Sequence, residues 1–271
     1  YFAAKAKLFT FEFADLAVIN IDDAHGVQLA ATTELPVMSV SRHDQRATWH
    51  YVSISPDYSG AHVAIRGSGG ILIEGKVQLH GGYNYDNLLM AVAIATESGI
   101  DPIDIAALLP HLTGAAGRLE SVRLGQNFTA LVDYAHSPDA VARVLETAHE
   151  ITDGRVIAVL GCGGDRDTSK RPLMGKALHD GADVSIFTSD NPRSEKPEEI
   201  LVQMTLGLDI QEPSAVIVDR AAAIKSAVDE AQEGDLVLIL GKGHEKGQEI
   251  AGVNHPFDDR VELARAIEDK K

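Results

Sequence analysis

The sequence predicts an α/β protein of two domains, the second built on a mostly parallel sheet. Its 271 residues are enough for two hydrophobic cores, and 45 % of them are hydrophobic while 24 % are charged, as in globular proteins. Between residues 49 and 80, three runs alternate polar and apolar residues at period two, which indicates an antiparallel meander. After residue 117, apolar strands alternate with helical segments, which is typical of a parallel sheet covered on both faces.

The first half begins with a helix-forming stretch, YFAAKAKLFTF, that has no capping residue before it. We therefore expect the chain to begin partway through a larger protein. A strand is predicted in LAVINIDD at 16–23, followed by a helix in AHGVQLA and by the alternating runs WHYVSIS, GAHVAIRG and GILIEGKVQLHG. NYDNLLMAVAIATESGI at 84–100 is predicted to be a helix capped by Asn84. A short helix in DPIDIAALLPHL leads to the linker TGAAG at 113–117.

The second half is predicted from apolar runs that alternate with helical segments. Strands are expected in FTALVDYA, RVIAVLGCGG, ADVSIFTSD, SAVIVD and DLVLILGKGHE. Helices are expected in SPDAVARVLETAHEI, KPEEILVQMTLGL and RAAAIKSAVDEA, the first with Ser137 as cap and Pro138 at its first position. In such sheets, ligands bind beyond the carboxyl ends of the strands. Three loops at those ends carry concentrated polar chemistry, at 161–171, 189–193 and 241–245.

Charge and cysteine content narrow the possible functions. The formal net charge of −16 argues against a nucleic-acid partner, which requires a basic face on the protein. An anionic ligand would need a local positive cluster, for which the candidates are Arg166, Lys170, Arg171, Arg193 and Lys242. No apolar run reaches the roughly 18 residues that span a bilayer, so no membrane partner is expected. The single cysteine, Cys162, excludes an internal disulfide framework and fits a reducing, cytoplasmic setting.

Two of the loops contain glycine-rich motifs. GCGGDRDTSKRP at 161–172 resembles a dinucleotide-binding fingerprint only superficially, because Arg166 stands where a third glycine is required. A nicotinamide dehydrogenase is therefore disfavoured. In GKGHE at 241–245, an ammonium, an imidazole and a carboxylate could recognise a zwitterion, with Glu245 accepting hydrogen bonds from an amine. No segment of the sequence has the G-x-x-x-x-G-K-[ST] spacing of a P-loop.

Three further clusters allow either a structural or a functional interpretation. In TSDNPRSEKP at 188–197, Pro192 stops the strand, and the Asp-Asn-Pro-Arg cluster suits a capped turn or a ligand site. Asp133, in VDYAHSP, could bind a pair of ribose hydroxyls or shape a helix-entry turn. Asn84 and Asn87 lie three apart on one predicted helix face, which suits reading a purine edge, although such pairs are usually caps.

Taken together, the segments YFAAK, GGYNYDN, GRLE, VDYAHSPDA, GCGGDRDTSKRPLMG, DNPRSEKP and LGKGHE resemble the Mur ligase family. Within that family they are similar to the branch that adds the third residue of the peptidoglycan stem. The resemblance covers nearly the whole chain, in family order. It implies that residues 1–114 are the latter part of a central ATP-binding domain and that 115–271 are a Rossmann-like carboxyl-terminal domain. The family's UDP-binding domain and P-loop would precede Tyr1, so this chain is expected to be inactive alone.

The resemblance implies an ATP-dependent ligase that joins meso-diaminopimelate to UDP-N-acetylmuramoyl-L-alanyl-D-glutamate through an acyl phosphate, in the cytoplasm and as a monomer. Lys5 and Arg118 match catalytic positions, and Lys5 resembles the lysine whose carbamate holds Mg²⁺, an ion that prefers oxygen ligands. The positions that match ATP-contacting residues are Asn84, Asn87, Arg118 and Asp133.

The resemblance also implies a site that selects the added amino acid, formed by Arg166, Asp190, Asn191, Pro192, Arg193, Gly241 and Glu245. meso-Diaminopimelate differs from L-lysine by one carboxylate. A guanidinium pairs that carboxylate bidentately, whereas bound L-lysine would leave the guanidinium without this partner. Arg193 therefore indicates meso-diaminopimelate. The alternatives are an L-lysine-adding enzyme, a folylpolyglutamate synthetase, which should lack DNPR and GKGHE, and a non-catalytic nucleotide- or partner-binding module derived from such a ligase.

Overall fold

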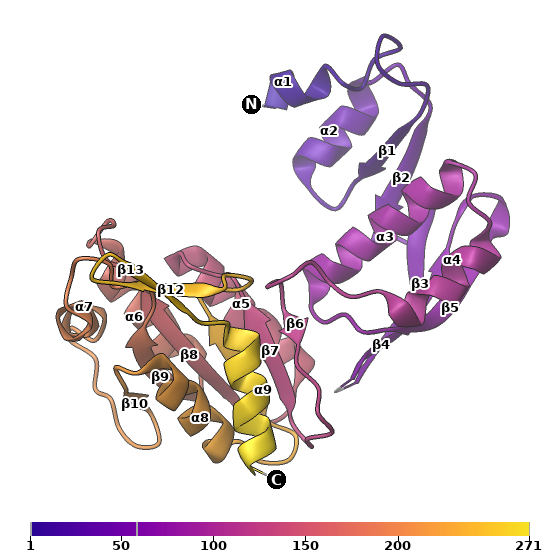
Figure 1. Cartoon of the computed structure of the whole chain (residues 1–271). Coiled ribbons are helices and arrows are strands. Elements are labelled where there is room, and N and C mark those ends of the chain that lie inside the picture. Colours follow the sequence, from indigo (N-terminus) through magenta and orange to yellow (C-terminus); the bar gives the residue numbers. More distant parts are fainter. Residues whose placement is uncertain (1, 58, 271) are drawn as a thin grey trace. The chain divides into compact units, whose positions relative to one another are not determined.

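The computed structural model describes residues 2–57 and 59–270, and the chain divides into two compact units, 1–113 and 114–271. We call these unit 1 and unit 2 (Figure 1). The division falls inside the predicted TGAAG linker. Among the described helices, none combines the length and the apolar character needed to cross a membrane.

Unit 1 is built, within its described residues, on a mixed five-stranded sheet. The strands are β1 (Ala17–Asn20), β2 (Val37–Ser41), β3 (Trp49–Asp57), β4 (Gly60–Arg66) and β5 (Leu72–Val77), which lie side by side in that order. The predicted meander is confirmed, because β3, β4 and β5 pair antiparallel. β2 was not predicted and pairs in parallel with β1 and β3. Its sequence, VMSVS, is too short to show a clear period.

Helices cover both faces of the unit 1 sheet. They are α1 (Phe2–Ala6), α2 (Ala24–Thr32), α3 (Gly82–Glu97) and α4 (Pro102–Leu108), with short 3₁₀ turns at Ser68–Gly70 and Leu109–His111. α3 and α4 share one core with β3, β4 and β5, whereas α2 packs on the other side of β1. The predicted cap of α3 was wrong: its N-cap is Gly81, and Asn84 lies inside the first turn, where its Nδ2 donates to the His80 carbonyl oxygen (2.8 Å).

Unit 2 contains the predicted parallel sheet. The strands are β6 (Glu120–Ser121), β7 (Thr129–Asp133), β8 (Val156–Cys162), β9 (Val184–Ser189), β10 (Ala215–Val216) and β11 (Leu236–Leu240). Their spatial order is β10-β9-β8-β11-β7-β6, and only the edge strand β6 is antiparallel to its neighbour. This confirms the Rossmann-like α/β class. β6 was not predicted, and β10 is shorter than the run SAVIVD suggested.

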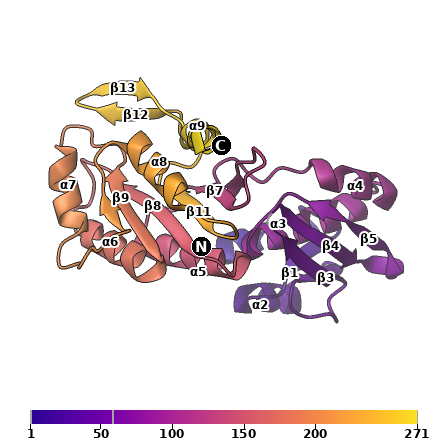
Figure 2. The same ribbon diagram turned by 90° about the horizontal axis from the view of Figure 1, so that it is seen from below.

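The helices of unit 2 lie on both faces of its sheet, with α5 and α6 along one face and α8 and α9 along the other (Figure 2). The helices are α5 (Pro138–Ile151), α6 (Lys170–Gly181), α7 (Pro197–Met204), α8 (Arg220–Glu230) and α9 (Asp259–Lys270). α5 begins as predicted, since the Ser137 hydroxyl accepts from the Ala140 amide (3.4 Å). α6 and α9 were not predicted: the sequence of α6, KRPLMGKALHDG, contains a proline and two glycines, and that of α9, DRVELARAIEDK, is rich in charge.

A small antiparallel hairpin, β12 (Gly247–Ile250) with β13 (Val253–Pro256), follows β11 in the sequence. Its turn residues, Ala251 and Gly252, have φ angles of 49° and 76°. Positive φ at both turn positions normally selects Asn-Gly or Asp-Gly. Because Ala stands at the first position here, no hairpin could be predicted from these residues.

Candidate functional site

A cavity of about 430 Å³ lies at the carboxyl edge of the unit 2 sheet. β9, β8, β11 and β7 are neighbours in the sheet, so the loops that follow them open at the same edge. The loops thereby bring together six of the predicted amino-acid-selecting residues, which line the cavity: Arg166, Asp190, Asn191, Arg193, Gly241 and Glu245. The seventh, Pro192, is buried. The loops predicted to converge therefore do so.

Asn191 and Glu245 line this cavity, and both contact a buried lysine that lies behind them. Asn191 Nδ2 donates to Glu245 Oε2 (3.0 Å), and Lys242 Nζ donates to the same carboxylate oxygen (3.1 Å). Burial by itself would raise the pKa of Glu245, but the hydrogen bonds from Asn191 and Lys242 outweigh it, and the pKa lies below its ordinary value. Glu245 is therefore an anion at neutral pH, suited to accept an ammonium group.

Arg193 is held in place by the β12–β13 hairpin. Its amide donates to the Glu249 carbonyl oxygen (2.9 Å), and its own carbonyl accepts from the Ala251 amide (2.7 Å). The guanidinium donates through NH1 to the Gly164 carbonyl oxygen (2.7 Å), and Nε lies 3.4 Å from a carboxylate oxygen of Glu249. The side chain remains 22 % exposed. Arg193 is thus oriented by its surroundings while part of its guanidinium is open to an anion.

Two glycines of the site are required by close contacts between the loops. A Cβ atom at Gly164 would lie 1.9 Å from the Pro192 carbonyl oxygen. Gly241 has a φ of 110°, and a Cβ atom there would lie 2.8 Å from Asp190 Oδ2. At these two positions, the lack of a side chain lets the loops approach one another.

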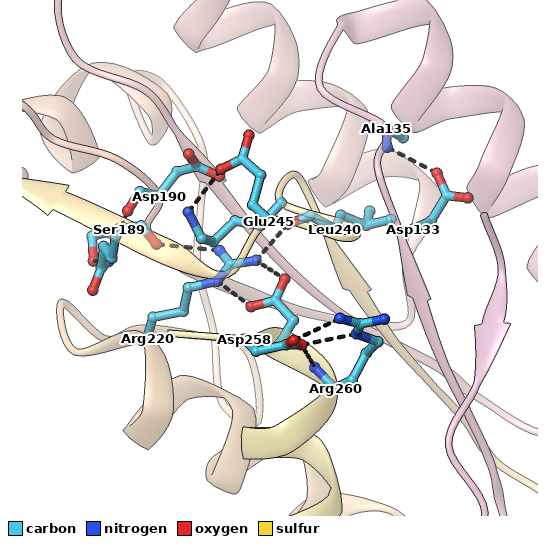
Figure 3. Close-up of polar contacts among 12 residues, drawn as sticks. Asp133, Ala135, Ser189, Asp190, Arg220, Leu240, Glu245, Asp258 and Arg260 are labelled. Carbon is cyan, nitrogen blue, oxygen red and sulfur yellow. Dashed lines mark hydrogen bonds and ion pairs between the residues drawn. The ribbon is translucent and has the colours of Figure 1, made fainter. Parts of the chain in front are cut away.

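Asp190 lies where β9 ends, among buried positive groups. Burial raises the pKa of Asp190, and the charges of Arg220 and Lys242 oppose that rise. Arg220 forms a fully buried ion pair with Asp259 (2.7 Å). It also donates to the carbonyl oxygens of Ser189 (3.2 Å) and Leu240 (2.8 Å), the last residues of β9 and β11 (Figure 3). This guanidinium ties together the two strand ends that deliver Asp190 and Gly241.

Three of the other positive candidates, Arg166, Lys170 and Arg171, line the cavity. Arg166 and Lys170 are exposed. Arg171 is buried, and its guanidinium donates to both oxygens of Glu195 (2.8 and 2.7 Å). Those hydrogen bonds lower the pKa of Glu195 to about 2. Burial raises the pKa of Cys162 to about 12, so its thiol stays protonated at the cavity wall.

Two of the predicted nucleotide-contacting residues, Arg118 and Asp133, lie in unit 2. Asp133 is buried, and its carboxylate accepts from the amides of Leu119 (2.9 Å) and Ala135 (2.8 Å), the latter visible in Figure 3. The bond from Ala135 shapes the turn into α5, which is the structural interpretation that the sequence left open, and the bond from Leu119 ties Asp133 to the segment before β6. Arg118 is exposed, and its guanidinium carbon lies 5.4 Å from the centre of the Tyr134 ring.

The remaining predicted residues, Lys5, Asn84 and Asn87, belong to unit 1. Asn84 is buried and Asn87 is exposed on α3, so the two amides differ in accessibility. Lys5 is exposed on α1. Over residues 2–57 and 59–270, no group of three or more His, Cys, Asp or Glu side chains could hold a metal ion. An unmodified ammonium is not a metal ligand.

The hairpin residues Gln248 and Glu249 were missed from the sequence. Gln248 is buried, and its Nε2 donates to the Asp190 carbonyl oxygen (2.7 Å) and to the Ser189 hydroxyl (3.1 Å). The Glu249 amide donates to Asn191 Oδ1 (3.0 Å). The only available signal was their place a few residues after GKGHE, because the hairpin itself was not recognisable.

In this α/β protein, the Arg193 guanidinium and the Glu245 carboxylate come from the ends of different strands and line one cavity. Such a pair of opposite charges suits the binding of a zwitterionic amino acid. Comparison with known families agrees with this class. Residues 1–95 match the Mur ligase middle domain, and residues 117–243 match the Mur ligase glutamate ligase domain. The chain belongs to the Mur ligase family.

Individual relatives point to one branch of the family. The chain is 45 % identical to a UDP-N-acetylmuramoyl-L-alanyl-D-glutamate--2,6-diaminopimelate ligase of Streptomyces coelicolor, covering 98 % of this chain and 54 % of the relative. A solved structure of an enzyme with that name is 40 % identical, with a TM-score of 0.75, and covers 99 % of this chain and 56 % of the other. A folylpolyglutamate synthase of Mycobacterium tuberculosis, 19 % identical with a TM-score of 0.63 over 89 % of this chain and 56 % of the other, shares the fold alone. The chain thus spans about half the length of its curated relatives.

Proposed function

We propose that the complete gene product is an ATP-dependent ligase that adds meso-diaminopimelate to UDP-N-acetylmuramoyl-L-alanyl-D-glutamate through an acyl phosphate, in peptidoglycan synthesis. In this proposal, unit 1 is the latter part of the ATP-binding domain and unit 2 is the carboxyl-terminal domain that receives the amino acid. The observation that carries the proposal is that Arg193 and Glu245 both line one cavity and both present charge to it. The names of the relatives support it.

The cavity suits the zwitterionic end of a diamino diacid. We assign the ligand carboxylate to the guanidinium of Arg193. The contacts of NH1 with Gly164 and of Nε with Glu249 hold this guanidinium in a fixed orientation, while part of it remains exposed to the cavity. We assign the ligand ammonium to Glu245, whose Oε2 is held by Asn191 and Lys242. A ligand without the carboxylate offers no partner to the exposed part of this guanidinium, and a polar site discriminates strongly against such an analogue.

The other assignments rest on the family motifs. We assign Asp190, Pro192, Gly241 and Arg166 to the same amino-acid site, and Asn84, Asn87, Arg118 and Asp133 to ATP contacts. Arg118 would stabilise phosphoryl transfer by charge and placement rather than by covalent chemistry. A carbamate on Lys5 would supply the oxygen ligand that Mg²⁺ prefers. We further propose that the enzyme acts as a cytoplasmic monomer.

The test is an assay of the complete gene product with ATP, magnesium and the UDP-linked dipeptide. Phosphate release is compared between meso-diaminopimelate and L-lysine, with omission of the UDP-linked dipeptide as the control. Strong preference for meso-diaminopimelate is expected. Preference for L-lysine would keep the ligase and reject the selector role of Arg193, whereas no release with either amino acid would favour a non-catalytic module.

A further inference from the structure

We propose that Lys242 is a positioning residue for the amino-acid site, which sets the orientation of the Asn191 amide and of the Glu245 carboxylate without touching the ligand. This inference rests on the proposed function of the cavity. It assigns a role to a side chain that lies beneath the selecting residues, at a point where three separate segments meet.

Burial separates Lys242 from the ligand. Its side chain is 0 % exposed, and its ammonium lies 2.9 Å from Asn191 Oδ1 and 3.1 Å from Glu245 Oε2. Asn191 and Glu245 both line the cavity. Lys242 is therefore one layer behind the surface that meets the amino acid.

The hydrogen bonds of Lys242 decide which way the Asn191 amide faces. Oδ1 accepts from the Lys242 ammonium and from the Glu249 amide (3.0 Å), and both of those groups can only donate. Nδ2 must then point the other way, where it donates to Glu245 Oε2 (3.0 Å). Without the ammonium, one of the two constraints on the amide is lost, and Glu245 loses one of its two donors.

The charges nearby explain why an ammonium is tolerated in the interior. A buried cation is stable only when it is paired with anions. Lys242 pairs directly with Glu245, and its charge also acts on Asp190. Because Glu245 lines the cavity, the same ammonium that it stabilises also holds its carboxylate in place for a ligand ammonium.

The alternative is that Lys242 only stabilises the fold. A double-mutant cycle separates the two roles, because residues that act through one another have effects that are not independent. The cycle uses Lys242→Met, which keeps the length of the side chain and removes its charge, with Glu245→Gln and the double variant, all in the complete gene product. The matched control is Lys246→Met, since Lys246 is an exposed lysine four positions further along.

Steady-state phosphate release gives KM for meso-diaminopimelate and for ATP, and thermal unfolding gives Tm for each variant. Leaving a buried polar group unpaired corresponds to about a 10- to 100-fold effect on binding, so Lys242→Met is expected to raise the diaminopimelate KM by that factor. The KM for ATP is expected to change less than about twofold, as is every constant of Lys246→Met. In the double variant, the rise in KM is expected to stay well below the product of the two single rises.

Several outcomes would overturn the inference. A folded Lys242→Met with an unchanged diaminopimelate KM would do so, as would effects that multiply in the cycle. If Lys242→Met does not fold, Lys242→Arg takes its place, since a guanidinium keeps the charge but shifts the donors, and the same selective rise in KM is expected. Failure of both variants to fold would assign Lys242 to stability alone. An inactive wild-type protein would instead refute the proposed function, and with it this role.

Discussion

Replacing Arg193 by alanine tests the selector site most directly. In the proposed function, the guanidinium pairs the carboxylate that distinguishes meso-diaminopimelate from L-lysine. Hydrogen bonds to charged groups contribute about 1.5–3 kcal/mol, which corresponds to roughly a 10- to 150-fold rise in the KM for meso-diaminopimelate. The KM for L-lysine should hardly change, because lysine offers no carboxylate at that position. The preference between the two amino acids should therefore shrink by the same factor.

The backbone at position 193 provides an internal control. Its φ of 52° is left-handed, a conformation that costs a non-glycine residue about 1 kcal/mol. Arg193→Ala keeps this strain and Arg193→Gly relieves it, so the glycine variant should have the higher Tm while both lose the guanidinium. Arg193→Lys keeps the charge without the planar guanidinium, so its KM for meso-diaminopimelate should lie between those of wild type and Arg193→Ala.

The assay is phosphate release at saturating ATP and UDP-linked dipeptide, with the amino acid varied. Equal KM increases for Arg193→Ala and Arg193→Gly would show that the weaker binding of meso-diaminopimelate comes from loss of the guanidinium. A return of the KM toward the wild-type value in the glycine variant would show that it comes from distortion of the loop. An unchanged KM for meso-diaminopimelate in both variants would remove Arg193 from the site and refute the reasoning.

Two further predictions concern stability. Gly241→Ala should lower the free energy of unfolding by about 2–3 kcal/mol in urea denaturation, because it combines a φ of 110° with a Cβ atom 2.8 Å from Asp190 Oδ2. The control is Gly207→Ala, where φ is 78° and a Cβ atom meets nothing within 4 Å. It should lower the free energy of unfolding by only the cost of the backbone conformation, about 1 kcal/mol. Equal decreases in the free energy of unfolding at the two positions would contradict the steric argument. Hydrogen bonds from Arg171 depress the pKa of Glu195 from 4.5 to about 2, so Glu195 stabilises the fold above pH 4.5 and loses that effect as the pH falls toward 2. Denaturation at stepped pH should therefore show wild type more stable than Glu195→Gln at pH 7, with a difference that shrinks below pH 4.5, and a difference independent of pH would be inconsistent with this pairing.

Much of unit 2 was determined by local sequence. The apolar runs that became β7, β8, β9 and β11 are buried along their whole length, so their hydrophobicity alone marks them as central strands of a parallel sheet. Parallel strands end at a common edge, which is why the polar loops 161–171, 189–193 and 241–245 could be expected to converge. The motifs in those loops also indicated the family.

Only the tertiary structure decided how the site is supported. The hairpin that fixes Arg193 was not recognisable, because its turn has positive φ angles at an Ala-Gly pair, which is not one of the pairs that signal such a turn. The role of Lys242 depends on atoms of Asn191, 51 residues away in the sequence, and no local pattern encodes such a contact. Local propensity and periodicity report on a residue and its near neighbours along the chain. Hydrogen bonds between distant loops arise only once the sheet has placed those loops at one edge.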